Sequence, residues 1–256
     1  MDLTSVLGVL AAIAAISVGD IMEGGNPIHV VHLSSIIIIV PTTLCAAMVS
    51  THAHHVKAAF KEIKIVFLNP KINLQETIKS IVELSTQARK DGVLSLESKV
   101  AQIEDDFTRN GFGMIVDGKD IKSVQESLDV AIEELEEYYH GAAHYWITAG
   151  ESAPTFGLVG AVLGLMLALQ KLDNPQEMAL GIAGAFTATV TGIMCSYALF
   201  GPFGNKLKNK SKDILKEKVV ILEGIIGIAN GDNPRDLEMK LLNYIAPGQP
   251  KKSQFE

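Results

Sequence analysis

Four long apolar segments, separated by polar stretches, dominate the pattern of the chain. They are Leu3–Gly19, Val30–Ser50, Ser152–Gln170 and Met178–Asn205. The last runs for 28 residues without a charged side chain. A helix needs about 20 apolar residues to cross a bilayer, so each segment is long enough to span it or nearly so. The pattern predicts an all-α polytopic membrane protein with four transmembrane helices and a helical cytoplasmic domain.

Basic residues beside the apolar segments predict the orientation. Lysines follow the second and fourth segments (Lys57, Lys61, Lys64, Lys206, Lys208, Lys210 and Lys212), whereas residues 20–27 contain no base and residues 171–177 only one. Cytoplasmic flanks carry the excess of Lys and Arg, so both termini are predicted to be cytoplasmic. Turn residues at Gly24–Pro27 and Asn174–Pro175 would close the short outer loops. No base precedes the first segment, which favours an uncleaved anchor over a signal peptide.

The predicted domains follow from this layout. They are residues 1–56 (transmembrane helices 1 and 2), 57–150 (cytoplasmic helical domain), 151–205 (transmembrane helices 3 and 4) and 206–256 (cytoplasmic helix and tail). Within the cytoplasmic domain, periodic apolar positions predict a helix over Leu74–Ala88 and another from near Ser95 through Phe107. A third helix is expected from Asp120, continuing unbroken into the bilayer as far as Pro154.

The segment after the fourth span shows two further patterns. Lys206–Leu222 is predicted to be a basic amphipathic helix. Pro247–Glu256 is predicted to be a frayed tail, because chain ends with few apolar residues rarely pack.

Small residues recur on one side of each of the last two predicted spans. In the third span they are Gly150, Pro154, Gly157, Ala161, Gly164 and Ala168, and in the fourth Gly181, Ala185, Thr189, Gly192 and Ser196. Spacings of three and four place such residues on one helix face, where they let another backbone approach closely. One interpretation is an ordinary helix pair in a bundle. Two stripes with hydroxyls and no aromatic filling favour walls around a partner helix, an ion path or both.

Composition and motifs exclude several kinds of function. The chain is 48% hydrophobic with a positive mean hydropathy and a net charge of -7, which is unlike an ordinary soluble domain or a nucleic-acid binder. A Gly-rich phosphate loop, a nucleophile with a base and a cysteine cluster are all missing, so the sequence predicts neither an enzyme nor a cofactor. His52, His54 and His55 invite a metal interpretation, but only His52 and His55 share a helix face. A polar cap is the preferred interpretation, with no metal site.

The third and fourth predicted spans contain no carboxylate between Ser152 and Gln170 or between Met178 and Asn205. Ion pathways through membranes usually depend on a buried ionisable group. If the protein takes part in conduction, the ion-binding acid must therefore come from another chain. The sequence favours a machine of two components, in which this chain forms the walls.

Two stretches carry a family resemblance. Pro154–Leu165 (PTFGLVGAVLGL) and Gly181–Ile193 (GIAGAFTATVTGI) resemble the paired helices of the MotA/TolQ/ExbB proteins. The layout of two spans, a cytoplasmic insertion, two more spans and the exit Gly201–Lys206 is similar to flagellar stator subunits of the MotA type over nearly the whole chain. TolQ and ExbB proteins usually have three spans.

The resemblance implies a ring of identical subunits, five by family analogy, around single-span MotB-type helices that carry an ion-binding aspartate. Such a ring lies among inner-membrane lipids and turns the rotor through the protein FliG. By motif, the residues facing the partner helix or ion path would be Pro154, Thr155, Gly157, Ala161, Ala185 and Thr189. For Thr189 the alternative is a hydroxyl bonded to its own backbone.

The resemblance also implies coupling and rotor-facing roles. Pro154 and Pro202 would be conformational joints, the alternative being the ordinary start and end of a helix. Arg89 and Glu97 would face the rotor, the alternative being ordinary surface charge. Lys90, beside Arg89, leaves a second basic candidate.

Ala161 favours the proton as the driving ion, because sodium-driven relatives carry a second threonine there. Two rivals to the stator interpretation stay open: an ExbB/TolQ-type energiser of envelope transport, and a membrane scaffold that conducts nothing. A neighbouring gene for a single-span protein with an Asp in its span and a peptidoglycan-binding domain would favour the stator.

Overall fold

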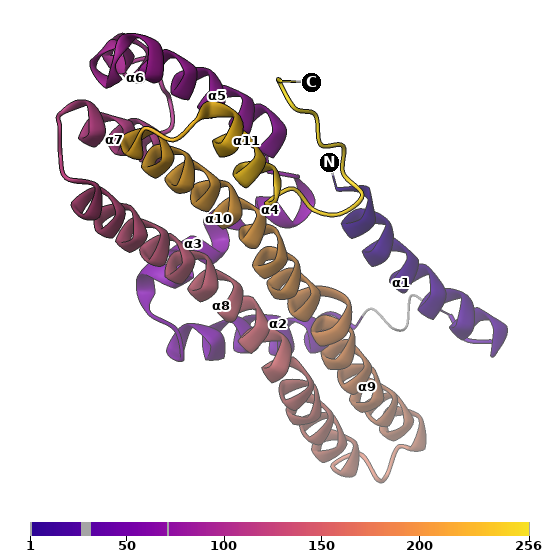
Figure 1. Ribbon diagram of the computed structural model, residues 1–256. Coiled ribbons are helices and arrows are strands. Elements are labelled where there is room, and N and C mark those ends of the chain that lie inside the picture. Colours follow the sequence, from indigo (N-terminus) through magenta and orange to yellow (C-terminus); the bar gives the residue numbers. More distant parts are fainter. Residues whose placement is uncertain (1, 27–31, 71, 256) are drawn as a thin grey trace. The chain divides into compact units, whose positions relative to one another are not determined.

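The computed structural model describes residues 2–26, 32–70 and 72–255, which contain helices and no strand (Figure 1). The elements of the first half are α1 (Leu3–Met22), α2 (Leu33–Val49), α3 (Ala53–Glu62), α4 (Lys64–Phe67), α5 (Leu74–Asp91), η2 (Val93–Leu96), α6 (Glu97–Val100) and α7 (Asp106–Val116). The second half contains α8 (Ile121–Leu169), α9 (Pro175–Met194), η3 (Cys195–Phe200), α10 (Gly201–Asn230) and α11 (Pro234–Leu242). The predicted all-α fold is confirmed.

The chain forms two compact units. One comprises Met1–Asn69 and Tyr138–Lys210, and the other Pro70–Glu137 and Ser211–Glu256. Both α8 and α10 therefore contribute residues to each unit. These divisions differ from the predicted domain limits at 56, 150 and 205. Helices α3 and α4 belong to the first unit, and α8 and α10 run on past the ends of the apolar segments.

The first unit holds the apolar helices. Three helices of the described chain are long and apolar enough to cross a membrane: Leu3–Met22, Ile121–Leu169 and the continuous stretch Pro175–Asn230. A fourth apolar helix, Leu33–Val49, is shorter at 17 residues. Residues 27–31, which include Pro27 of the predicted first turn and the first two residues of the predicted second span, lie outside the described residues.

Helix α8 is continuous from Ile121 to Leu169 and contains Pro154 in its interior. The prediction that one helix runs from near Asp120 to Pro154 is confirmed, and the helix extends fifteen residues beyond the proline. Proline at this position removes one N–H from the hydrogen-bond ladder without ending the helix.

The second unit has an apolar core made by α5, α7, the first part of α8, α10 and α11. Its fully buried side chains include Ile78, Phe112, Val124, Ile225 and Leu237. Helix α5 has the predicted periodicity. The helix predicted from Ser95 through Phe107 is wrong, because η2 ends at Leu96, α6 ends at Val100 and α7 starts only at Asp106. The Asp105 carboxylate caps that start by accepting the Thr108 N–H at 2.8 Å.

The C-terminal segment is more ordered than predicted. Lys206–Leu222 lies inside α10, and the end of that stretch enters the core, where Val220 and Ile221 are buried. The prediction of a frayed tail is wrong for the described residues up to Phe255. Ser253 Oγ and Gln254 N–H donate to the buried Glu238 carboxylate at 2.5 and 2.8 Å.

Candidate functional site

The small-residue stripes of α8 and α9 pack against each other within the chain. A β-carbon added to Gly157 would lie 3.0 Å from Gly192 Cα. One added to Gly164 would lie 3.1 Å from Ala185 Cβ, and one on Gly181 would lie 2.9 Å from Ala168 Cβ. Backbones in such close contact gain dispersion energy that larger side chains would prevent. The small residues therefore form a close contact between α8 and α9 within the chain, as the interpretation of an ordinary helix pair expects.

The six residues expected to face a partner helix do not share one open surface. Gly157, Ala161 and Ala185 are buried in this chain. Glycine and alanine suit both an internal helix contact and a contact with another chain, so their spacing alone could not tell the two apart.

The other three predicted residues keep some exposure. Thr155 is exposed, and Pro154 and Thr189 are half-buried. Thr189 Oγ1 donates to Ala185 O at 3.4 Å, so its hydroxyl is bonded to its own helix. The oxygen lone pairs of that hydroxyl stay available as acceptors.

A helical irregularity immediately precedes Pro202. The Gly201 N–H donates to Ser196 O, five residues earlier, and Cys195–Phe200 forms a π-helical turn. Proline cannot donate to the carbonyl four residues before it, so the ladder is already interrupted here. A β-carbon on Gly150 would lie 2.8 Å from Gly201 N, which means that α8 and α10 also touch backbone to backbone. Such π turns often mark functional sites.

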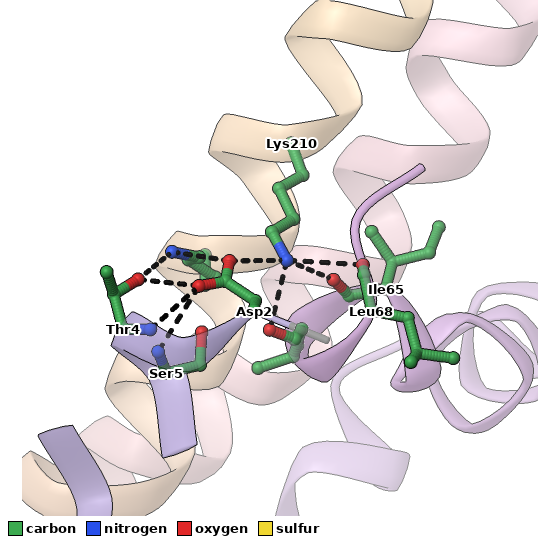
Figure 2. Close-up of polar contacts among 8 residues, drawn as sticks. Asp2, Thr4, Ser5, Ile65, Leu68 and Lys210 are labelled. Atoms are coloured by element: carbon green, nitrogen blue, oxygen red, sulfur yellow. Dashed lines mark hydrogen bonds and ion pairs between the residues drawn. The ribbon is translucent and has the colours of Figure 1, made fainter. Parts of the chain in front are cut away.

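A buried ion pair near the start of α1 was missed by the sequence reasoning. Lys210 Nζ lies 2.7 Å from Asp2 Oδ2 and donates to the carbonyls of Ile65, Val66 and Leu68 at 2.8, 3.2 and 3.2 Å (Figure 2). Lys206 also pairs with Asp2, at 2.9 Å. Hydrogen bonds from Lys210, Thr4 and Lys206 hold the Asp2 pKa far below its usual range.

Lys210 therefore joins three elements of the first unit: α10, the start of α1 and the end of α4. Lysine is rarely buried without partners, and here one carboxylate and three carbonyls surround it. The sequence signal was ambiguous, because Lys210 is one of four lysines at every second position after Asn205.

Arg89 and Glu97 are both exposed and lie in the second unit, on α5 and α6. Gln87 Nε2 donates to Ser95 O at 2.9 Å, which links the end of α5 to η2. Glu97 also borders a hollow of about 490 Å³ that Arg109 and Asp117 help to line. Both charges therefore lie on elements that pack against the apolar core of the second unit.

The three clustered histidines are close in space. The His54 and His55 ring centroids lie 4.0 Å apart and those of His52 and His54 lie 5.7 Å apart. Among the described residues, no group of His, Cys, Asp and Glu side chains is arranged to hold a metal ion.

Long apolar helices, a pair of them in backbone contact, define a polytopic helical membrane protein. The model of the MotA/TolQ/ExbB proton channel family matches residues 99–219. Motility protein A of Helicobacter pylori is 79% identical over 256 residues, all of both chains, and that of Bacillus subtilis is 34% identical over 96% of this chain and 91% of its own. This chain belongs to the MotA/TolQ/ExbB proton channel family.

Two solved structures are similar to this chain over nearly its whole length. The structure of C. jejuni MotAB matches all of both chains with a TM-score of 0.96 at 55% identity. The flagellar MotAB stator complex from Bacillus subtilis matches 95% of this chain and 96% of its own with a TM-score of 0.87 at 33% identity.

Proposed function

We propose that the chain is a flagellar stator subunit that couples proton flow across the inner membrane to torque on the rotor. The observation that carries this proposal is the match of the whole chain, at a TM-score of 0.96, to a chain of the MotAB complex. Curated relatives that cover the chain from end to end are motility proteins, which favours a stator over an ExbB/TolQ-type energiser. The protein acts as a channel wall and mechanical element, not as an enzyme.

The partner is a MotB-type single-span subunit that carries the ion-binding Asp. This role for a second chain is supported by the last two apolar segments, which contain no carboxylate. Copies of the chain surround the partner helices in a ring, five by family analogy, and the ring contacts FliG on the rotor. Helix α1 has no buried residue in the single chain, so lipid or neighbouring chains must cover its apolar surface.

In the proposed topology, α1, α2, the last part of α8 and α9 cross the inner membrane, and both termini are cytoplasmic. Helix α2 has 17 residues, about 26 Å at 1.5 Å per residue, close to the hydrocarbon thickness of about 30 Å. The basic residues next to α2 and α10 support the orientation. The second unit is then the cytoplasmic, rotor-facing part.

The site residues divide into three roles under this proposal. Thr155, Thr189 and Pro154, which keep exposure, face the partner helix, while Gly157, Ala161 and Ala185 hold α8 against α9 behind them. Pro154 and Pro202 are the coupling joints. Arg89 and Glu97 face the rotor.

Swimming speed in sodium-free medium, with and without a protonophore, tests the proposal in the organism that carries the gene. Deletion of the gene should abolish swimming, and a plasmid copy should restore it. Restored cells should swim without sodium and stop when the protonophore is added. Swimming by the deletion strain, or swimming that needs sodium and resists the protonophore, would contradict the proposal.

A further inference from the structure

One face of α8 carries titratable and hydroxyl side chains at helical spacing. These are His140, His144, Thr148, Glu151 and Thr155. At about 100° per residue they fall within a sector of about 80°, and they extend over about 22 Å of helix. Thr148 is half-buried and the other four are exposed. We name this set the α8 polar stripe.

The opposite face of the same helix is fully packed. Ala142, Tyr145, Ala149 and Ala153 have no solvent exposure. The Tyr145 hydroxyl donates to Leu44 O of α2 at 3.2 Å. Helices α2 and α3 therefore lie on the side away from the α8 polar stripe, and the stripe is left open in the single chain.

Neighbouring members of the stripe are within reach of one another. The His140 and His144 rings are stacked, with centroids 6.2 Å apart and planes 5° apart. His144 Nε2 lies 3.5 Å from Thr148 Oγ1. Thr148 and Glu151, and then Glu151 and Thr155, are separated by a single helical turn, which places their side chains about 5–6 Å apart at Cβ. One water molecule can bridge each such gap.

The chemistry of these groups suits proton transfer. An imidazole exchanges a proton near neutral pH, and a carboxylate can accept one and pass it on. Charged groups at the edge of a membrane span are costly when they face lipid and usually line a water-filled path. Thr155 is the member of the stripe that lies within the apolar segment of α8, and the proposed function places it beside the partner helix.

We propose that the α8 polar stripe is the proton outlet, which carries protons from the partner's acid to the cytoplasm. The inference rests on the proposed function and adds the route that a proton takes after it leaves the partner's acid. A proton leaving the partner's carboxyl passes through water at Thr155 to the Glu151 carboxylate and makes it a neutral acid. Glu151 then passes this proton through Thr148 and a bridging water to His144. His144 passes it through water to the neighbouring His140, and His140 releases it to bulk water. One proton enters and one leaves, and no oxidant or reductant is needed.

The groups near the stripe on other elements do not take part in this path. His55 of α3 contacts α8 at Gly141, where an added β-carbon would lie 2.1 Å from its Nδ1. Glu62 accepts a hydrogen bond from Tyr138 at 3.0 Å. Both lie on the α2 and α3 side of the helix.

Proton flux through the complex of this chain with its single-span partner tests the outlet. The complex is reconstituted in vesicles, a potassium diffusion potential drives protons, and an internal pH dye reports them. Glu151→Gln and His144→Ala should each lower the flux by about tenfold or more, since removal of a proton-transfer group has effects of this size. Imidazole in the buffer should restore flux to His144→Ala, because it replaces the missing group, and should leave Glu151→Gln unchanged.

His54→Ala and Glu23→Gln are matched controls, since both residues are exposed and lie off the stripe. They should keep the flux of the unaltered complex. Equal flux in all variants, a similar fall in the controls, or a loss in His144→Ala that imidazole does not restore would overturn the outlet. An unaltered complex that carries no protons would overturn the proposed function itself.

Discussion

Gly157 of α8 and Gly192 of α9 lie in backbone contact: a β-carbon on Gly192 would come 2.8 Å from Gly157 Cα and 2.8 Å from Ala153 O. Backbone atoms cannot move aside as a flexible side chain can. We expect Gly192→Ala to force the helices apart and to lower stability by about 1–3 kcal/mol, the usual cost of overpacking. The thermal unfolding temperature of the purified complex measures the effect.

Gly184→Ala is the matched control on the same helix. A β-carbon there would meet His32 Cε1 at 3.7 Å, an ordinary contact distance. Alanine also favours helix over glycine, so this variant should unfold at the same temperature as the unaltered protein or slightly above it. Equal unfolding temperatures for both variants would show that the glycine contact does not hold α8 to α9.

The π turn before Pro202 predicts a separation of motility from stability. At present the Gly201 N–H donates to Ser196 O, five residues earlier. In Pro202→Ala the new N–H can donate to Ala198 O, four residues earlier, as in a regular α-helix. Stability should stay the same or rise, by up to about 3 kcal/mol. Swimming should stop, because the joint is lost while the helix is not. Swimming speed and the amount of chain in the membrane are the two measurements.

Pro247→Ala provides the comparison, because Pro247 is exposed and lies after α11. It should swim normally. Normal swimming in Pro202→Ala as well would remove this proline from the coupling residues.

Charge reversal at the rotor-facing positions should reduce torque without unfolding the chain. Arg89 and Glu97 are exposed, and surface substitutions usually change stability by less than about 0.5 kcal/mol. Arg89→Glu and Glu97→Lys should each impair swimming, and a reversed charge on the rotor protein should partly restore it. Lys90→Glu should have the smaller effect if Arg89 is the contact. A larger effect of Lys90→Glu would reassign the contact to Lys90.

Much of the helical layout could be predicted from hydrophobic periodicity. The apolar segments and α5 follow from local pattern, because three- and four-residue spacings of apolar side chains specify a helix face directly. The break between Val100 and Asp106 was missed, since its signal is a capping aspartate inside an otherwise periodic stretch. The ordered tail was missed because its contacts are with Glu238 of α11, and no pattern within the tail itself indicates that partner.

The candidate site was harder to predict. The stripes located the close helix contact, but the same spacing of Gly157 and Ala185 fits a contact inside the chain or between chains. Lys210 and Asp2 are 208 positions apart, and no local pattern pairs one lysine among four with a distant carboxylate. Contacts of that kind are set by tertiary packing.

The Asp2 carboxylate should make stability depend on acid pH. Hydrogen bonds from Lys210, Thr4 and Lys206 lower its pKa in the folded chain, so the unfolded chain binds more protons near the ordinary Asp pKa of about 3.9. The stabilisation is thus fully present above that pKa and is lost as pH falls toward the folded value. Asp2→Asn should lower the unfolding temperature equally at pH 7 and pH 5, and the difference should shrink below about pH 4.

Asp213→Asn serves as the control for this pH series, because Asp213 is exposed and surface substitutions usually change stability by less than about 0.5 kcal/mol. A difference between Asp2→Asn and the unaltered chain that instead grew below about pH 4 would contradict the ion pair with Lys210.

The contact of the tail with Glu238 predicts that deletion of residues 251–256 weakens the second unit. Glu238 is 1% exposed and accepts hydrogen bonds from Ser253 and Gln254. Without these donors a buried carboxylate is left unsatisfied, at a cost of about 1–3 kcal/mol. In the full chain, Glu238→Leu removes the hydrogen bonds from Ser253 and Gln254 and should lower stability. In the shortened chain, which lacks these donors, the same substitution removes an unsatisfied buried charge and should raise stability. Hydrogen exchange of α11 amides measures both effects, and the same sign of change in the two backgrounds would show that the tail does not hold Glu238.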